Sequence, residues 1–229
     1  MIRFLKINFV YFLSKKNICS LFICIMIMLL IDLYVIISNQ TLSLNAIEIQ
    51  NYSWETLYSF NKIIIVILGC FLFNNFILSV NDNYKVLFII NSDNVKFYYL
   101  SKVITVLIVL FIFVFFSFAI YTIINISCNT RFVMTIQCVK GYLFVFLLSV
   151  VYGLISLICT KILDNTYSIM IPIVIYICCE FFEFNDSIVN TFFPNFTLTM
   201  LENDFFLSLI HCIIVSFFYL VTFCLIQNE

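Results

Sequence analysis

The sequence predicts an all-α integral membrane protein: six transmembrane helices, an N-terminal amphipathic helix on the membrane surface, and a short helix on the cytoplasmic side between spans two and three. Two observations predict this fold class. Of the 229 residues, 64% are hydrophobic and only 10% are charged, whereas about a quarter of the residues in a soluble domain are charged. The apolar residues also come in long runs, and a helix satisfies its own backbone hydrogen bonds in lipid.

The first 16 residues are expected to form the amphipathic helix, because Leu5, Phe9 and Phe12 recur at helical spacing. Such a helix lies on the inner leaflet with its lysines toward anionic headgroups. The alternative is a cationic tail that only enforces topology. Residues 17–229 are expected to form one transmembrane domain.

Six apolar segments are long enough to cross a hydrocarbon core of about 30 Å. They cover residues 17–38, 61–80, 102–126, 141–160, 166–184 and 205–227. The first is longer than the apolar region of a signal peptide, and no small-residue cleavage site follows it. Pro172 is expected to kink the fifth span.

The distribution of positive charge predicts orientation in a cell membrane. With both termini in the cytoplasm, eight of the eleven Lys and Arg residues lie inside, as the positive-inside rule favours. The abundance of Ile, Phe and Asn suggests a low-GC bacterium. Glu180, Glu183 and Asp186, at the outer end of the fifth span, are expected to form a solvated face. The functional alternative is a negative rim that attracts cationic peptides.

The segment 81–102 is too polar to span a membrane and too apolar to be a free loop. Its first part is expected to be a short helix along the membrane, ended by turn-forming residues. Ser92 or Asp93 can then cap a helix that runs through Lys96 and Lys102 into the third span. This shape predicts a docking surface for a cytoplasmic partner. Its expected contact residues are Tyr84, Lys85, Leu87, Phe88, Asn91, Ser92, Asp93 and Asn94.

This arrangement resembles the membrane subunit of type-2 ATP-binding-cassette (ABC) exporters, the six-span permeases. Leu87 to Ile90 match the short coupling helix of that family, Lys96 matches a basic position, and Ser101-Lys102 match the pair that opens span three. Ser92 stands where a proline is usual, and the basic run is reduced to one lysine. The resemblance covers the whole chain by topology and the segment 81–102 by motif.

The resemblance implies a permease subunit that exports an amphipathic substrate, such as a peptide or an antimicrobial peptide. It also implies a separate ABC ATPase subunit, which would carry ATP and Mg, and a second permease subunit as homo- or heterodimer partner. The chain itself is expected to be non-catalytic and without a cofactor. A Walker loop has the pattern G-x-x-x-x-G-K, and the three glycines lie in or beside spans, at Gly69, Gly141 and Gly153. Membrane lipid is an expected partner, and nucleic acid is not.

Polar residues inside spans are candidates for a substrate pathway, because burying them in lipid is costly. The candidates are Asn74 and Asn75 in the second span, Asp32 in the first and His211 in the sixth. The structural alternatives are hydrogen bonds between helices for the asparagines and contact with the membrane interface for Asp32 and His211. A single histidine and the absence of ligand spacing predict no metal site.

Two other function classes fit a chain of this size. An intramembrane CAAX-type protease needs an adjacent Glu-Glu pair and several histidines, whereas Glu180 and Glu183 are separated and His211 is alone. A stand-alone immunity protein without transport activity needs no ATPase-facing helix. Charge reversal at Lys85 and Lys96 separates this alternative from an exporter.

Overall fold

The computed structural model describes residues 5, 8–10, 12, 15–40, 46–78, 95–128, 136–160, 162–163, 165–182, 187–194 and 204–226. The regular elements in these ranges are all α-helices, which confirms the all-α prediction. In chain order they are α2 (Lys15–Gln40), α3 (Ala46–Leu78), α5 (Val95–Cys128), α6 (Ile136–Cys159), α7 (Asn165–Phe182), α8 (Ser187–Phe192) and α10 (Phe205–Ile226).

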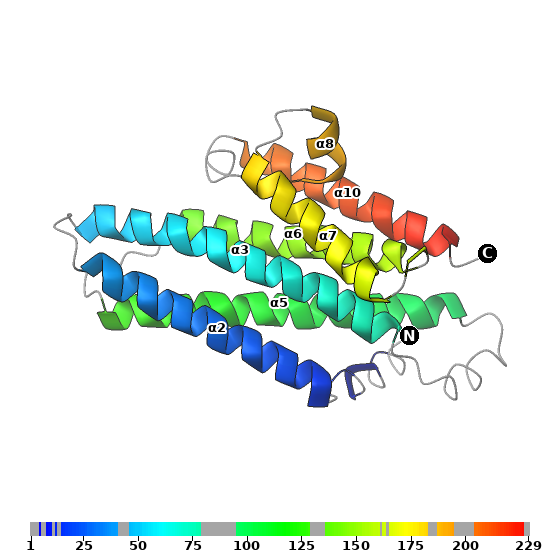
Figure 1. Cartoon of the computed structure of the whole chain (residues 1–229), viewed down its shortest axis with the longest axis horizontal. Helices are drawn as coiled ribbons and strands as arrows, with labels where there is room; N and C mark the ends of the chain where they lie inside the picture. The colour runs from blue at the N-terminus through cyan, green and yellow to red at the C-terminus, as the bar shows by residue number, and fades with distance from the viewer. Residues whose placement is uncertain are drawn as a thin grey trace.

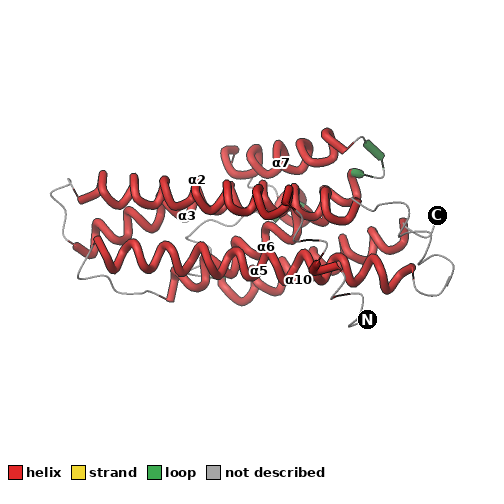
Figure 2. The backbone as a smooth tube through the Cα atoms, turned by 90° about the horizontal axis from the view of Figure 1, so that it is seen from below, coloured by secondary structure: helices red, strands yellow, loops and turns green. Residues whose placement is uncertain are grey.

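The six long helices form a bundle in which successive helices run in opposite directions (Figure 1). The helix α3 is central, since it packs against α2, α5, α6 and α7, most extensively against α6. The view at right angles shows α7 on the outside of the bundle (Figure 2). α2 begins, α3 ends, α5 begins and α10 ends at the same end of the bundle. We call this the terminal end, and the other the opposite end.

In the described part of the chain, five helices are long and apolar enough to cross a membrane, as in a multi-pass membrane protein. The five candidate spans are Asn17–Ser38, Tyr58–Asn75, Leu100–Ser127, Ile136–Cys159 and Phe205–Ile226. They correspond to five of the six predicted spans. The remaining prediction, 166–184, coincides with α7, whose described apolar part, Thr166–Glu180, is shorter and contains Pro172.

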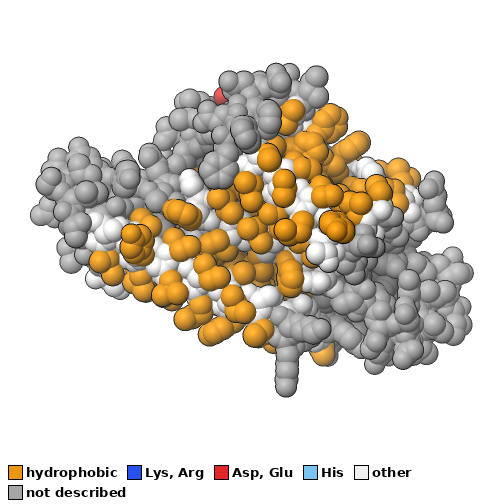
Figure 3. Space-filling view, viewed as in Figure 1, with side chains coloured by type: hydrophobic (Ala, Val, Ile, Leu, Met, Phe, Trp, Pro, Cys, Tyr) orange, Lys and Arg blue, Asp and Glu red, His pale blue; other side chains and the backbone are white. Residues whose placement is uncertain are grey.

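On the face shown in Figure 3, the described surface of the bundle is largely apolar. On α2, Phe22, Leu30 and Tyr34 are well exposed, and on α10 the same holds for Ile214 and Phe217. Leaving apolar area in water costs roughly 25 cal/mol per Å². Lipid removes that cost, so this surface fits a bilayer.

Two glycines allow α3 and α6 to pack closely. A Cβ atom added at Gly69 of α3 would lie 2.6 Å from the Ser149 carbonyl oxygen on α6. A Cβ atom added at Gly153 of α6 would meet the Phe73 ring on α3. Small residues serve this role in membrane bundles because they let backbones approach.

The N-terminal and coupling segments are described only in part. The helix α5 begins at Val95, which confirms that one helix runs through Lys96 and Lys102 into the third span. Among the first 16 residues, Asn8 and Phe12 are helical and buried. The Asn8 Nδ2 donates to Ser101 Oγ at 2.8 Å, so this part of the N-terminal segment contacts the start of α5.

Candidate functional site

Among the described residues, three clusters of buried polar side chains join α3 to its neighbouring helices. The first, which we call the carboxylate cluster, consists of Asp32 on α2, Asn61 on α3 and Tyr142 on α6. Asn61 Nδ2 lies 3.3 Å from Asp32 Oδ1 and 3.3 Å from the Tyr142 hydroxyl oxygen. Asp32 is only 1% exposed. One amide therefore bridges a carboxylate of one helix and a phenol of another.

The second, the ion-pair cluster, joins α3 to α7. Lys62 Nζ lies 2.7 Å from Glu180 Oε1, with side-chain exposures of 2% and 18%. The Tyr176 hydroxyl donates to Glu180 Oε2 at 3.4 Å, and Lys62 Nζ lies 5.2 Å from the centre of the Tyr58 ring. Each charge thus has an opposite charge and an aromatic neighbour, which is the arrangement that burial of an ion pair requires.

Helical spacing explains how one short piece of α3 serves both clusters. Tyr58 and Lys62 are four residues apart and share a face, whereas the adjacent Asn61 points about 100° away, toward α2 and α6. The charges of the two clusters are −1 for Asp32, −1 for Glu180 and +1 for Lys62. Together they carry a net charge of −1 when all three groups are ionised.

The third, the serine cluster, lies nearer the terminal end and joins α3, α6 and α7. Asn74 Nδ2 donates to Ser168 Oγ at 2.6 Å and lies 3.4 Å from Ser156 Oγ. The Ser156 hydroxyl in turn donates to the Cys70 carbonyl at 3.4 Å. All three cluster members are neutral and fully buried, so this cluster joins helices by hydrogen bonds without charge.

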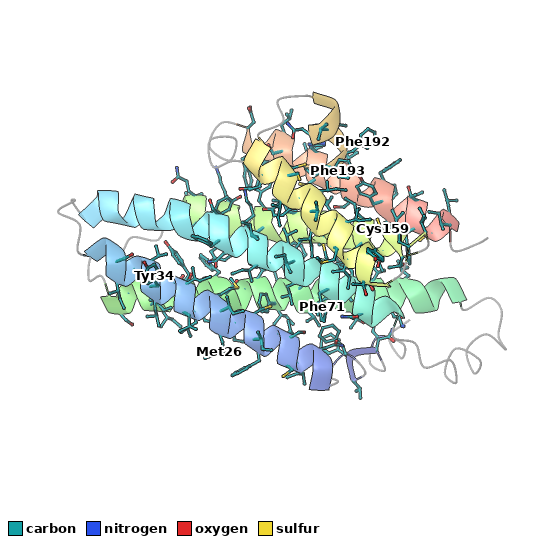
Figure 4. The ribbon with its side chains drawn as sticks, viewed as in Figure 1. Met26, Tyr34, Phe71, Cys159, Phe192 and Phe193 are labelled. Carbon is teal, nitrogen blue, oxygen red and sulfur yellow. The ribbon has the colours of Figure 1, made fainter. Side chains whose placement is uncertain are left out.

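A short segment after α7 is held against the bundle through its backbone carbonyls. The last carbonyls of a helix have no hydrogen-bond partner within the helix. At the end of α8, side chains from other helices provide these partners. Tyr219 donates to the Phe192 carbonyl at 2.9 Å, and His211 Nε2 lies 3.0 Å from the Thr191 oxygen. Figure 4 labels Phe192 at this end of α8. The Tyr152 hydroxyl reaches the Pro194 carbonyl at 3.5 Å.

The four predicted pathway residues do not form one site. Asp32 belongs to the carboxylate cluster and Asn74 to the serine cluster, and along α3 the thirteen steps from Asn61 to Asn74 span about 20 Å. Asn75 is half-buried, and His211 contacts the α8 segment. The eight predicted docking residues, at positions 84–94, lie outside the described residues.

Two sequence expectations differ from the structure. Asp32 does not reach the surface, because α2 turns it toward Asn61 and leaves Tyr34 on the exposed face (Figure 4). Glu180 is not part of a solvated face, because Lys62 on the neighbouring helix lies within ion-pair distance. Glu183 and Asp186 fall outside the described residues.

Sequence reasoning missed Asn61, Lys62 and Tyr142 as members of a site. The sequence does contain a sign of the role of Lys62. A lysine followed directly by a long apolar run indicates a buried charge that needs an acidic partner. Its partner is 118 residues away in sequence, however, and only helix packing identifies it.

Comparison with protein-family models, curated proteins and solved structures found no match to this chain.

Proposed function

We propose that this chain is the permease subunit of an ATP-driven exporter of the ABC type, moving an amphipathic substrate such as a peptide out of the membrane or cytoplasm. The observation that carries the proposal is the arrangement of α3 and α5. α3 ends and α5 begins at the terminal end of the bundle. The lysine-bearing segment between them therefore starts and finishes on the side that the positive-inside rule assigns to the cytoplasm.

In this proposal α7 is the sixth crossing. Its 18 residues give a length of about 27 Å, close to the hydrocarbon thickness of about 30 Å, and small mismatches cost little. Six crossings leave both termini on one side. The antiparallel order of the helices supports this count.

The coupling mechanism follows from which helices adjoin the proposed docking segment. A soluble ATPase subunit binds residues 81–94, and its closure on ATP pushes this segment. The push passes to α5, which begins at Val95, and to α3. Because α3 packs against α2, α5, α6 and α7, its displacement reaches most of the bundle. Such a rigid-body shift is a known way for a membrane transporter to alternate its access.

The exposed apolar faces of α2 and α10 are available to lipid and to a second permease subunit. We propose a pair of permeases, with the substrate pathway between them. The Lys62–Glu180 pair and the serine cluster hold each half together as a unit, because they join α7 to α3 at two levels.

The test is co-purification of the tagged full-length protein from its native host in mild detergent, with partners identified by mass spectrometry. The proposal predicts a soluble ATPase with a Walker motif. The double variant Lys85→Glu/Lys96→Glu should lose it while membrane expression stays unchanged. Lys161→Glu, a charge reversal between the predicted spans 141–160 and 166–184, is the matched control and should retain it.

Recovery of the protein alone, or with membrane partners only, would contradict the proposal. A stand-alone immunity protein would then be the better reading. In that case the double charge reversal leaves protection of the host cell unchanged.

A further inference from the structure

The carboxylate of Asp32 is buried without a cation among the described residues. Its Oδ1 accepts a long hydrogen bond of 3.3 Å from Asn61. Its Oδ2 is buried and has no hydrogen-bond partner in the described part of the chain. Lys62, at the next position of α3, lies against Glu180 at 2.7 Å. A buried carboxylate in this position is stabilised by a proton or by a bound cation.

The neighbours of Asp32 are suited to a metal cation because they offer further oxygen atoms. Asn61 is 2% exposed, and its Oδ1 is also buried with no hydrogen-bond partner in the described chain. Rotating this amide exchanges Oδ1 and Nδ2, which brings Oδ1 to the position facing both Asp32 and the Tyr142 hydroxyl. The rotation gives up both Nδ2 contacts, to Asp32 and to Tyr142, so it requires a cation between the three oxygens.

The spacing also agrees with a coordination shell. Hard cations the size of Ca²⁺ hold oxygens at roughly 2.3–2.6 Å, so neighbouring oxygens at right angles lie roughly 3.3–3.7 Å apart. After the rotation, Asn61 Oδ1 takes the position now held by Nδ2. That position lies 3.3 Å from Asp32 Oδ1 and 3.3 Å from the Tyr142 hydroxyl oxygen. Na⁺ is nearly as large as Ca²⁺ and has the same preference for oxygen.

We propose that Asp32, Asn61 and Tyr142 bind a single Na⁺ ion between α2, α3 and α6. One carboxylate with two neutral oxygen donors supplies one negative charge, which suits a monovalent ion better than a divalent one. Transition-metal sites use a different set of donors, and the described residues contain no group of three or more His, Cys, Asp or Glu side chains able to hold such an ion. The bound ion ties α2 to the α3–α6 pair. This inference does not depend on the proposed exporter function, because it concerns the isolated chain.

The test is equilibrium binding of radioactive ²²Na⁺ to the detergent-purified full-length protein, with choline chloride to keep ionic strength constant. We expect saturable binding at one site per chain. Asp32→Asn should abolish it, and Tyr142→Phe should weaken it roughly tenfold. The control is Asp204→Asn, which makes the same change at an exposed carboxylate and should leave binding unchanged. Thermal unfolding of each variant verifies that it is folded, and Na⁺ should raise the unfolding temperature of the wild type but not of Asp32→Asn.

Three outcomes would overturn the proposal. The first is no saturable Na⁺ binding to folded wild-type protein. The second is binding that survives in folded Asp32→Asn. The third is an unfolding temperature that depends on pH through Asp32 and not on Na⁺, which would assign a proton in place of the metal ion. Each is measured without an ATPase, so failure here leaves the co-purification test of the exporter proposal unaffected.

Discussion

Two neighbouring residues of α3 show two ways of placing polar groups inside a membrane bundle. Lys62 belongs to the ion-pair cluster, in which its positive charge is matched by Glu180 at 2.7 Å. Asn61 belongs to the carboxylate cluster, in which the negative charge of Asp32 has no matching cation among the described residues. The matched pair joins α3 to α7 and is explained by structure alone. The unmatched carboxylate calls for a further partner, so it is the stronger candidate for binding.

The largest effect is expected from breaking the matched pair. Lys62→Met leaves Glu180 without its cation, and removing one partner of a buried pair costs about 3–5 kcal/mol. Because Glu180 is 18% exposed, we expect the lower part of this range. The measurement is the free energy of unfolding in mixed SDS micelles. Lys140→Met is the control, because Lys140 lies 4.8 Å from the Phe205 ring centre and such a contact contributes about 0.5–1 kcal/mol.

The double variant Lys62→Met/Glu180→Leu sharpens this test. Replacing a whole buried pair by apolar residues is often neutral, so the double variant should recover most of the stability lost by Lys62→Met. A double variant no more stable than the single one would show that the two charges are not coupled.

A smaller loss is expected where α3 and α6 approach closely. Gly153→Ala places a methyl group against the Phe73 ring, and overpacking of this kind costs about 1–3 kcal/mol. Val139→Ile adds one carbon at an exposed position of the same helix and should change the unfolding free energy little. Equal effects of the two substitutions would argue against the close approach of the helices.

The uncharged serine cluster should contribute less than the ion pair. Asn74→Ala removes the hydrogen bonds to Ser168 and Ser156, and hydrogen bonds between membrane helices average about 0.6 kcal/mol. We expect a loss of about that size in the same unfolding assay. A loss as large as that of Lys62→Met would mean that charge is not what distinguishes the clusters.

The smallest loss is expected at the unmatched carboxylate. Asp32→Asn keeps the shape of the side chain and the Oδ1 acceptor, and it removes a charge that no described cation neutralises. In Na⁺-free buffer the loss should be smaller than the roughly 0.6 kcal/mol of an average hydrogen bond between membrane helices. A destabilisation comparable with that of Lys62→Met would show that Asp32 has a partner of its own and would end the contrast between the clusters.

Hydropathy predicted which helices are apolar enough to span a membrane better than it predicted helix ends or contacts. The first span, 17–38, coincides with the candidate span found in the structure. In contrast, α3 begins at Ala46, well before the predicted residue 61, because a helix can continue beyond its lipid-facing part. Burial of Asp32 was not predictable, since a helix that is apolar on every side gives no sign of which face is inward. The Lys62–Glu180 pair depends on the packing of α3 against α7, which no local pattern specifies.

The proposed permease has both termini and the segment 79–94 between α3 and α5, which contains the docking residues, in the cytoplasm, and epitope accessibility measures this orientation. One tag is inserted in the segment 79–94 and another is added at the C-terminus, in separate full-length variants, and antibody binding is compared in intact and permeabilised cells. We expect antibody to reach both tags only after permeabilisation. A tag in the segment 79–94 that is reached from outside intact cells would contradict it, because an ATPase in the cytoplasm could not then bind that segment.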